Sequence, residues 1–392
     1  MRDEHALLLL CARVNPDAPT RTGIARLARE KLDWQYLVGA AQRHGIEPLL
    51  FRNLNAICPS AVPPDILSAL SATCLNIAQK NLLLAHELIE ILNLLSANDI
   101  SAIPYKGPVL ALAAYGNLAL RPITDLDILI RPRDLRRAQA ILRGAGFRDD
   151  TLFDPQEEAV HLEANCEWML TNSRVILDVH WQVMPKFFYF PLDLDGVWQR
   201  LTPLMLAGTC VNALAIEDAV LILCVHGAKH IWKRLEWVVS VAELARVQTR
   251  LDWDALRARA RATGVERMVA LGFLLAQQLL DAELPAPIAS AVRADHALED
   301  LANQIRVRLF DENDVDDAVF EGTFVDALHA QMYARPLDRL RYYWYAVCTP
   351  TVSDVRAFRL PRSLTGLYRA LRPLRVLARF GPKIINRQFR GV

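Results

Sequence analysis

The 392-residue sequence predicts an α+β protein, in which a small mixed sheet is flanked by N- and C-terminal helical regions. Strand patterns, in which apolar and polar side chains alternate, fall between residues 99 and 205. Before and after this segment, apolar residues recur at the spacing of helices that bury one face. We therefore expect a helical region over 1–98, a sheet-containing core over 99–205, and a helical region with a basic tail over 206–392.

The N-terminal region is rich in leucine and alanine. Residues 82–92 show the clearest helical spacing, and Pro59, Pro63 and Pro64 interrupt the pattern before them. A helix is predicted there, after a proline-marked break.

The first strand, over 100–105, leads into a turn at Lys106 and Gly107. Pro108 suits the first position of a helix, which we expect to run to about Tyr115. The free N–H groups at a helix N-terminus bind phosphate, and Lys106 adds a positive charge. An ordinary strand-to-helix connection would explain Gly107 and Pro108, but it would not explain the lysine.

The next strand, over 125–130, begins with two carboxylates. Side chains alternate along a strand, so Asp125 and Asp127 share one face while Leu126 and Ile128 face a core. Two carboxylates about 7 Å apart repel each other, and a divalent cation with oxygen ligands compensates such a pair. A metal site is the prediction, with a chance pair of aspartates at a strand start as its alternative.

A hairpin is predicted from strands near 166–170 and 175–180. Asp178 and His180 share a face of the second strand, so Asp178 is the candidate third carboxylate and His180 a neighbour that orients it. On the preceding segment, which we expect to be extended, His161 and Glu163 form another pair on one face.

From Ile216 onward the pattern is helical again. One face of a predicted helix in this region carries four basic or titratable side chains, His226, Lys229, His230 and Lys233. This face either packs in the core or turns its positive charge toward a phosphate group.

The tail from Arg356 to the end has ten arginines or lysines and no acidic residue, with leucines at helical spacing. Such a helix either docks on the domain and pairs its arginines with the acidic run at 311–317, or lies on an anionic membrane surface.

Composition narrows the function classes. The net charge of +1 gives no general electrostatic argument for nucleic-acid binding. Seven cysteines without paired close spacing argue against a disulfide framework and against a zinc site. No apolar run has the length of a membrane span or the basic start of a signal peptide, so we expect a cytoplasmic protein.

Three short motifs carry a resemblance to a known family when they are taken together. They are Lys106-Gly107, Arg121 shortly before Asp125-Leu126-Asp127, and Asp178-Val179-His180-Trp181. Together they resemble the uncharacterised nucleotidyltransferase family of the DNA polymerase beta-like superfamily. The core of the resemblance covers 105–181, and weaker similarity extends over most of the chain.

The resemblance implies that Asp125 and Asp127 bind a catalytic pair of Mg²⁺ ions, or Mn²⁺, with Asp178 as third carboxylate. It also implies that Gly107 and its helix hold the triphosphate. The superfamily has a glycine-serine turn where this chain has Lys106-Gly107-Pro108, so Lys106 is the candidate replacement for the serine. Arg121 is a further candidate for neutralising phosphate charge.

The predicted function is metal-dependent transfer of a nucleoside monophosphate from an NTP to a hydroxyl of a small molecule or a peptide or protein. An Asp-x-Asp glycosyltransferase is an alternative, but it gives no role to Lys106-Gly107 or Asp178. A non-catalytic interaction protein that retains the fold is the other alternative.

Overall fold

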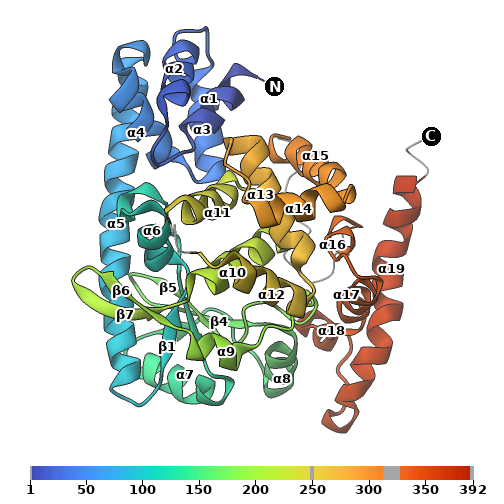
Figure 1. The fold of residues 1–392 in the computed structure, drawn as a ribbon. Coiled ribbons are helices and arrows are strands. Elements are labelled where there is room, and N and C mark those ends of the chain that lie inside the picture. The colour runs from blue at the N-terminus through green and yellow to red at the C-terminus, as the bar shows by residue number, and fades with distance from the viewer. Residues whose placement is uncertain (1, 248–250, 312–326, 389–392) are drawn as a thin grey trace.

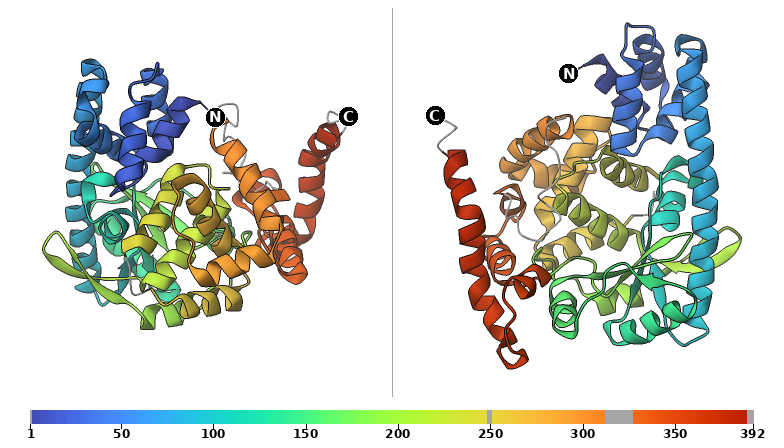
Figure 2. Two further views of the ribbon diagram at one scale, coloured as in Figure 1. Left: turned by 45° about the horizontal axis from the view of Figure 1, so that its top comes forward. Right: turned by 180° about the vertical axis from the view of Figure 1, so that it is seen from behind.

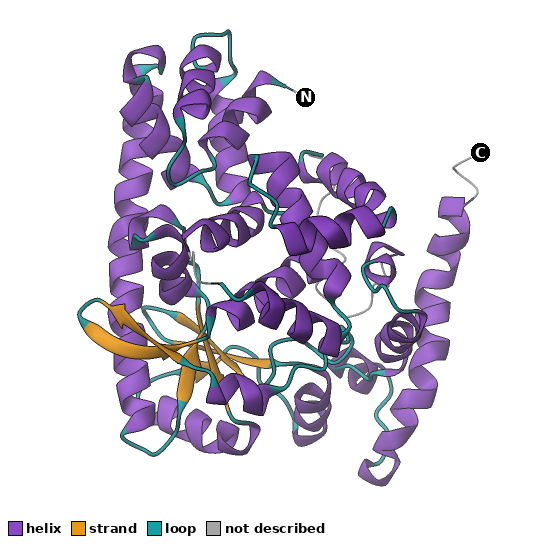
Figure 3. Cartoon of the chain, viewed as in Figure 1, coloured by secondary structure: helices purple, strands orange, loops and turns teal. Residues whose placement is uncertain are grey.

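The computed structural model of the chain describes residues 2–247, 251–311 and 327–388, with side chains up to residue 378 (Figure 1). Helices surround a five-stranded sheet and a separate two-stranded sheet (Figure 3). The predicted α+β class, with helical regions on both sides of a small mixed sheet, is confirmed.

The larger sheet is mixed, with strand order β1-β2-β5-β4-β3. Strand β2 lies between β1, to which it is antiparallel, and β5, to which it is parallel. Strands β4 and β5 form the predicted antiparallel hairpin. The strands are β1 Ala102–Pro104, β2 Leu126–Ile130, β3 Arg148–Asp149, β4 Glu167–Thr171, β5 Ile176–His180, β6 Thr202–Leu206 and β7 Thr209–Ala213.

The N-terminal helices lie at one end of the molecule, and the long helix α5 runs along its side (Figure 1). Helix α5 has 33 residues and begins at Pro64, where the missing N–H of proline costs no hydrogen bond. It contains the helix that we predicted over 82–92. These elements are α1 Asp3–Cys11, α2 Ala18–Leu27, α3 Trp34–His44, α4 Glu47–Ile57, η1 Pro59–Ala61 and α5 Pro64–Ser96.

Short helices connect the strands. The predicted helix after Lys106 is present as α6, although it begins at Gly107 rather than Pro108. These elements are α6 Gly107–Tyr115, η2 Leu118–Leu120, η3 Pro132–Asp134, α7 Leu135–Gly144, α8 Pro155–Ala164 and α9 Leu194–Gln199.

The segment that carries His161 and Glu163 is helix α8, so our prediction that it is extended was wrong. The signal that determines the helix lies at its start. Asp154 and Glu157 form a capping box, and Pro155 occupies the first helical position. In a helix, residues two apart do not share a face, so His161 and Glu163 do not form the expected pair.

From Ile216 onward the described chain is helical, whereas strand β7 lies within the region over 206–392 that we expected to be helical. Helices α10, α11 and α13 pack against one another and α11 packs against α6, which places them over one face of the sheet (Figure 1). The helices are α10 Ile216–Lys229, α11 Leu235–Val247, α12 Trp253–Thr263, α13 Glu266–Leu280, α14 Ala286–Ala294, α15 Ala297–Leu309, α16 Ala327–Gln331, α17 Pro336–Cys348, α18 Val352–Ala357, η4 Arg362–Leu367 and α19 Tyr368–Gln388.

The central strand β2 is buried on both faces and separates two hydrophobic cores. Leu126, Ile128 and Ile130 belong to a core formed with α5 and α7. Leu129 and Ile103 belong to the other core, which combines the N-terminal helices with α10, α11 and α13. Asp127 alternates with the first set, so it points toward the face that the C-terminal helices cover.

The C-terminal helix α19 lies at the outer edge of the molecule (Figure 2). Leu371, Leu374 and Leu377 are 39%, 65% and 65% exposed, so these leucines do not provide the packing that the docking alternative requires, although Tyr368 and Arg372 of the same helix are buried. The arginines do pair with acidic side chains, which belong to α8, to the N-cap of α8 and to α18. Residues 312–317 of the acidic run, which we predicted as the alternative partners, lie outside the described part of the chain. The ion pairs join Arg356 to Glu157, Arg359 to Asp154, Arg369 to Glu163, and Arg372 and Arg375 to Asp354.

Within the described residues, no helix combines the length and the apolar character needed to cross a membrane.

Candidate active site

Asp127 and Asp178 lie side by side on neighbouring strands. In the parallel pairing of β2 with β5 they are partners in register, so their side chains leave the sheet on the same face. Together with His180 they offer three ligand atoms that lie within 4.8 Å of one another. The structure therefore brings together two of the three carboxylates that the sequence singled out.

Two basic side chains contact the Asp127 carboxylate. Lys106 Nζ lies 2.9 Å from Asp127 Oδ1, and His180 Nε2 lies 3.1 Å from the same oxygen. Burial raises the pKa of Asp127, but Lys106 and the hydrogen bond from His180 outweigh it and bring the pKa well below its usual range. Asp127 is therefore ionised throughout the physiological pH range.

The same contacts determine the charge of His180. Burial lowers the pKa of its imidazole, but the hydrogen bond to Asp127 and the charge of Glu167 raise it to about 10. His180 thus carries a positive charge at neutral pH and bridges Asp127 and Glu167.

The Asp178 carboxylate makes no comparable contact with a basic side chain among the described residues. It is 9% exposed, and its Oδ1 is buried without a hydrogen-bond partner among the described residues. Burial, followed by the charge of Glu167, raises the pKa of Asp178 to about 7. A buried carboxylate oxygen that lacks a donor and lies beside an ionised aspartate is suited to a divalent cation.

Asp125 lies one residue before β2 and is partly exposed. Its Oδ1 accepts a hydrogen bond of 3.1 Å from the Thr124 hydroxyl. Its charge contributes to the raised pKa of Asp178 and to that of Lys106, so it belongs to the same electrostatic site. Asp125 is nevertheless outside the group of ligand atoms formed by Asp127, Asp178 and His180.

Gly107 forms the turn beneath Asp125. Its φ is +52°, and a Cβ at this position would lie 3.4 Å from the carbonyl oxygen of Asp125. The positive φ therefore favours glycine at this turn, whereas the distance to the Asp125 loop is an ordinary contact. Lys106 is the N-cap residue of α6, and its side chain makes no capping hydrogen bond with the backbone N–H groups at this end of the helix.

Arg121 precedes the Asp125 loop, and its backbone carbonyl accepts a 2.8 Å hydrogen bond from the Asn81 side chain. Its positive charge contributes to the lowered pKa of His226 on α10, which places the guanidinium near that helix.

The His226–Lys233 segment lies over the site, but it is not one continuous helix as we predicted. Helix α10 ends at Lys229, and Ile231 and Trp232 have positive φ values of 52° and 50°. This turn inserts Trp232, which is fully buried, against Gly227.

The two histidines of this segment are neutral at physiological pH. Their rings lie 4.7 Å apart, and both contact Trp237. Burial lowers the pKa of His226 far below its usual value, and Lys106 lowers it further. Lys229 in turn lowers the pKa of Glu167, so its charge faces the carboxylates. The positive charge of this segment is thus carried by its lysines.

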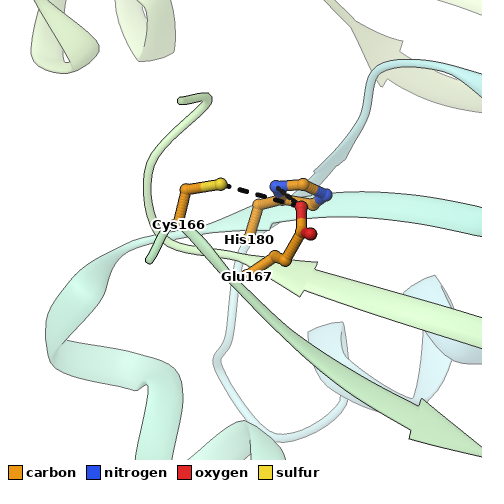
Figure 4. Close-up of side chains that lie close together, drawn as sticks. All are labelled: Cys166, Glu167 and His180. Carbon is orange, nitrogen blue, oxygen red and sulfur yellow. Dashed lines mark hydrogen bonds and ion pairs between the residues drawn. The ribbon is translucent and has the colours of Figure 1, made fainter. Parts of the chain in front are cut away.

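Glu167 is a site residue to which our sequence analysis gave no role. It is the first residue of β4 and the register partner of His180, whose Nδ1 lies 3.4 Å from Glu167 Oε2 (Figure 4). The sequence signal was present, because Glu167 begins a strand of the same hairpin as Asp178. Its position opposite His180 depends on the hairpin register.

His161 and Glu163 are occupied elsewhere. His161 Nε2 lies 3.0 Å from the carbonyl oxygen of Glu167, and Glu163 forms ion pairs with Lys186 and Arg369. Both contacts are consistent with structural roles that join α8 to its neighbours.

Comparison with known proteins places this site in a family. A sequence model described as "Uncharacterised nucleotidyltransferase" matches residues 30–281, well over half of the chain. A search of curated proteins gave no significant match. Among solved structures, the solution structure of the antibiotic-resistance factor ANT(2'')-Ia matches at 14% identity with a TM-score of 0.32, covering 45% of this chain and 91% of that one.

The matched range contains every strand of the larger sheet and each of the candidate site residues from Lys106 to Lys229. On the basis of this match, the chain belongs to the uncharacterised nucleotidyltransferase family and is an NTP-using transferase.

Proposed function

We propose that this nucleotidyltransferase transfers a nucleoside monophosphate from an NTP to a hydroxyl group of a small molecule or of a peptide or protein, in a reaction that depends on Mg²⁺. The observation that carries the proposal is the register pairing of Asp127 with Asp178 on one face of the sheet. A glycosyltransferase would leave Asp178 and the Lys106 turn unexplained, and the family match favours nucleotidyl transfer.

The side chains suit divalent cations bound through oxygen. Asp127 and Asp178 would hold them, with Asp125 as a further ligand from the loop before β2. The fit rests on the buried Oδ1 of Asp178, which lacks a donor, and on Asp127, whose two short contacts both end on Oδ1. When bound, Mg²⁺ or Mn²⁺ would neutralise charge on the phosphates and lower the pKa of the acceptor hydroxyl.

Asp178 is the proposed base. A carboxylate within hydrogen-bond reach of the acceptor hydroxyl can act as a general base. The acceptor oxygen attacks the α-phosphorus, its proton passes to Asp178, and the bond from the α-phosphorus to the bridging oxygen breaks. Pyrophosphate leaves with that oxygen.

Lys106, Gly107 and Arg121 form the proposed phosphate side. Lys106 neutralises Asp127 in the ligand-free protein, so cation binding at Asp127 frees the ammonium group to contact a phosphate. The backbone at the start of α6 provides N–H donors for the same group. Lys229, whose charge already acts on Glu167, adds positive potential from α10.

Mass spectrometry of acceptors tests the reaction class. The full chain would be incubated with each NTP and Mg²⁺ together with fractionated small molecules, peptides or proteins. We expect an acceptor mass that increases by one nucleoside monophosphate, and no increase when Asp178→Asn replaces the wild type. A gain of a sugar from a nucleotide-sugar instead would favour the glycosyltransferase alternative.

We further propose that the protein works in the cytoplasm and touches anionic membranes through α19. The support is the exposure of Leu371, Leu374 and Leu377, together with the basic residues that follow them in the sequence, Arg379, Lys383 and Arg387. Sedimentation with anionic vesicles, but not with neutral ones, is the expected result. Leu374→Asp should abolish it, and equal sedimentation of the variant would remove this proposal.

A further inference from the structure

We propose that Cys166, Glu167 and His180 form a second metal site, which binds a divalent cation of the zinc class. The three side chains offer one sulfur, one oxygen and one nitrogen atom within 4.8 Å of one another. Figure 4 shows them converging from the start of β4 and the end of β5. The site adjoins the Asp127–Asp178 pair and shares His180 with it: Nε2 of the ring faces Asp127, and Nδ1 faces Glu167.

The separations suit one metal ion. Cys166 Sγ lies 3.6 Å from Glu167 Oε2, and His180 Nδ1 lies 3.4 Å from the same oxygen. Around zinc, with bonds of about 2.0–2.3 Å, atoms at the vertices of a tetrahedron lie about 3.3–3.8 Å apart. Both distances fall in this range, and the separation of Cys166 Sγ from the His180 ring nitrogen is within 4.8 Å.

The orientation of His180 is a second, independent observation. Its Nδ1 is buried and makes no hydrogen bond within the described part of the chain, and the side chain is only 2% exposed. Its Nε2 lies 3.1 Å from Asp127 Oδ1. A histidine that binds a metal typically donates its other ring N–H to a carboxylate, which is the arrangement found here.

The donor set selects the class of metal. A thiolate and an imidazole favour zinc and related transition metals over Mg²⁺, which prefers oxygen ligands. Three protein ligands leave a fourth position for water or substrate. The cation would hold the His180 ring with its Nε2–H toward Asp127, and so position that carboxylate.

The backbone preorganises these donors. Trp181 N and Gln182 N donate to the carbonyl oxygen of Cys166 at 2.9 and 3.3 Å, so the residue before β4 is fixed against the residues after β5. The proposal differs from our expectation, which was that the cysteine spacing argues against a zinc site. That expectation considered motifs in which cysteines pair along the sequence, whereas here the ligands meet through the hairpin register.

Titration of the purified full chain with Co²⁺, a coloured substitute for zinc, tests the proposal. We expect one equivalent to give a thiolate-to-cobalt charge-transfer absorption, which Zn²⁺ abolishes by competition. Cys166→Ser should lose this absorption, whereas Cys210→Ser, which changes an exposed cysteine outside the cluster, should keep it. Zn²⁺ should also raise the melting temperature of the wild type and of Cys210→Ser but not of Cys166→Ser.

Absence of the absorption in the wild type, or its persistence in Cys166→Ser, would overturn the proposal. His180 would then be an imidazolium that bridges Asp127 and Glu167 without a metal. Unchanged circular dichroism of metal-free Cys166→Ser establishes that the variant is folded. Asp178→Asn separates the two sites, because it should keep the cobalt absorption while losing nucleotidyl transfer.

Discussion

Asp127 and Asp178 are register partners on adjacent parallel strands, yet the pKa of Asp127 is lowered and the pKa of Asp178 is raised. Asp127 is ionised because Lys106 and His180 contact it, whereas burial near Glu167 raises the pKa of Asp178 to about 7. Two adjacent carboxyl groups with separated pKa values can act as a permanent anion and as a proton acceptor.

The first prediction concerns pH. Below pH 7 a cation must displace the proton of Asp178, so the apparent affinity for Mg²⁺ should rise about tenfold per pH unit up to pH 7 and then level off. Calorimetric titration with Mg²⁺ and a non-hydrolysable NTP analogue in buffers of different ionisation enthalpy would measure the proton released. An affinity that does not change between pH 5.5 and pH 8 would show that Asp178 is not a ligand.

The second prediction concerns stability. The folded Asp178 carboxyl titrates near pH 7 and the unfolded one near its ordinary value of about 3.9, so the folded state binds the proton more tightly. Its contribution to stability is full below pH 3.9 and is lost as the pH rises through 7. Metal-free Asp178→Asn should therefore be more stable than the wild type at pH 8, by about 2–4 kcal/mol.

Denaturant unfolding at pH 4 and pH 8 measures this difference. The gain should shrink or vanish at pH 4, where the wild-type carboxyl is protonated in the folded state. Asp195→Asn is a suitable control because Asp195 is exposed, and it should change stability little at either pH. Destabilisation of Asp178→Asn at pH 8 would mean that a favourable contact of the carboxylate has been overlooked.

The third prediction separates nucleotide binding from folding at Lys106. Lys106→Ala should weaken NTP binding by about 1.5–3 kcal/mol, because it removes a charge-assisted contact. It should also destabilise the protein by about 3–5 kcal/mol, since Asp127 would lose a partner in a buried ion pair. Lys186→Ala removes an ion pair at a more exposed position and should do neither.

Calorimetry below the melting temperature of each variant measures the binding change. If Lys106→Ala is destabilised but binds the NTP as well as the wild type does, the lysine serves only to neutralise Asp127.

The fourth prediction uses two glycines with similar backbone conformations. Gly107 and Gly116 have φ of +52° and +66°, so alanine strains the backbone at both positions by about 1–2 kcal/mol. At Gly107 the strain arises next to Lys106 and in contact with the Asp125 loop, whose carbonyl oxygen would lie at an ordinary contact distance of 3.4 Å from the Cβ, whereas at Gly116 no atom lies within 4 Å. Gly107→Ala should therefore reduce turnover, and Gly116→Ala should lower only stability. Equal turnover in the two variants would show that the backbone conformation at Gly107 does not position Lys106 or the Asp125 loop for the reaction.

Much of this arrangement was predictable, because short-range patterns determine it. Alternation predicted β2 and β5, and the glycine with proline predicted the start of α6 to within one residue. Helix α8 was missed because its capping box was overlooked in favour of an apparent alternation. Strand alternation and helix-start signals are therefore sufficient to predict β2, β5, α6 and α8 from the sequence.

Contacts across the fold were not predictable in the same way. The ion pair of Lys106 with Asp127 and the place of Glu167 opposite His180 depend on strand order and register. The end of α10 at Lys229 depends on Trp232, which packs against Gly227 and Gly272. A single sequence does not specify such pairings, because many registers satisfy the same alternation.

The most direct test of the central claim is to count bound Mn²⁺ ions by electron paramagnetic resonance in the presence of a non-hydrolysable NTP analogue. The account predicts two ions per chain in the wild type and the loss of at least one in each of Asp125→Asn, Asp127→Asn and Asp178→Asn, with Cys166→Ser unchanged. The same number of ions in all five proteins would contradict a carboxylate metal site at Asp125, Asp127 and Asp178.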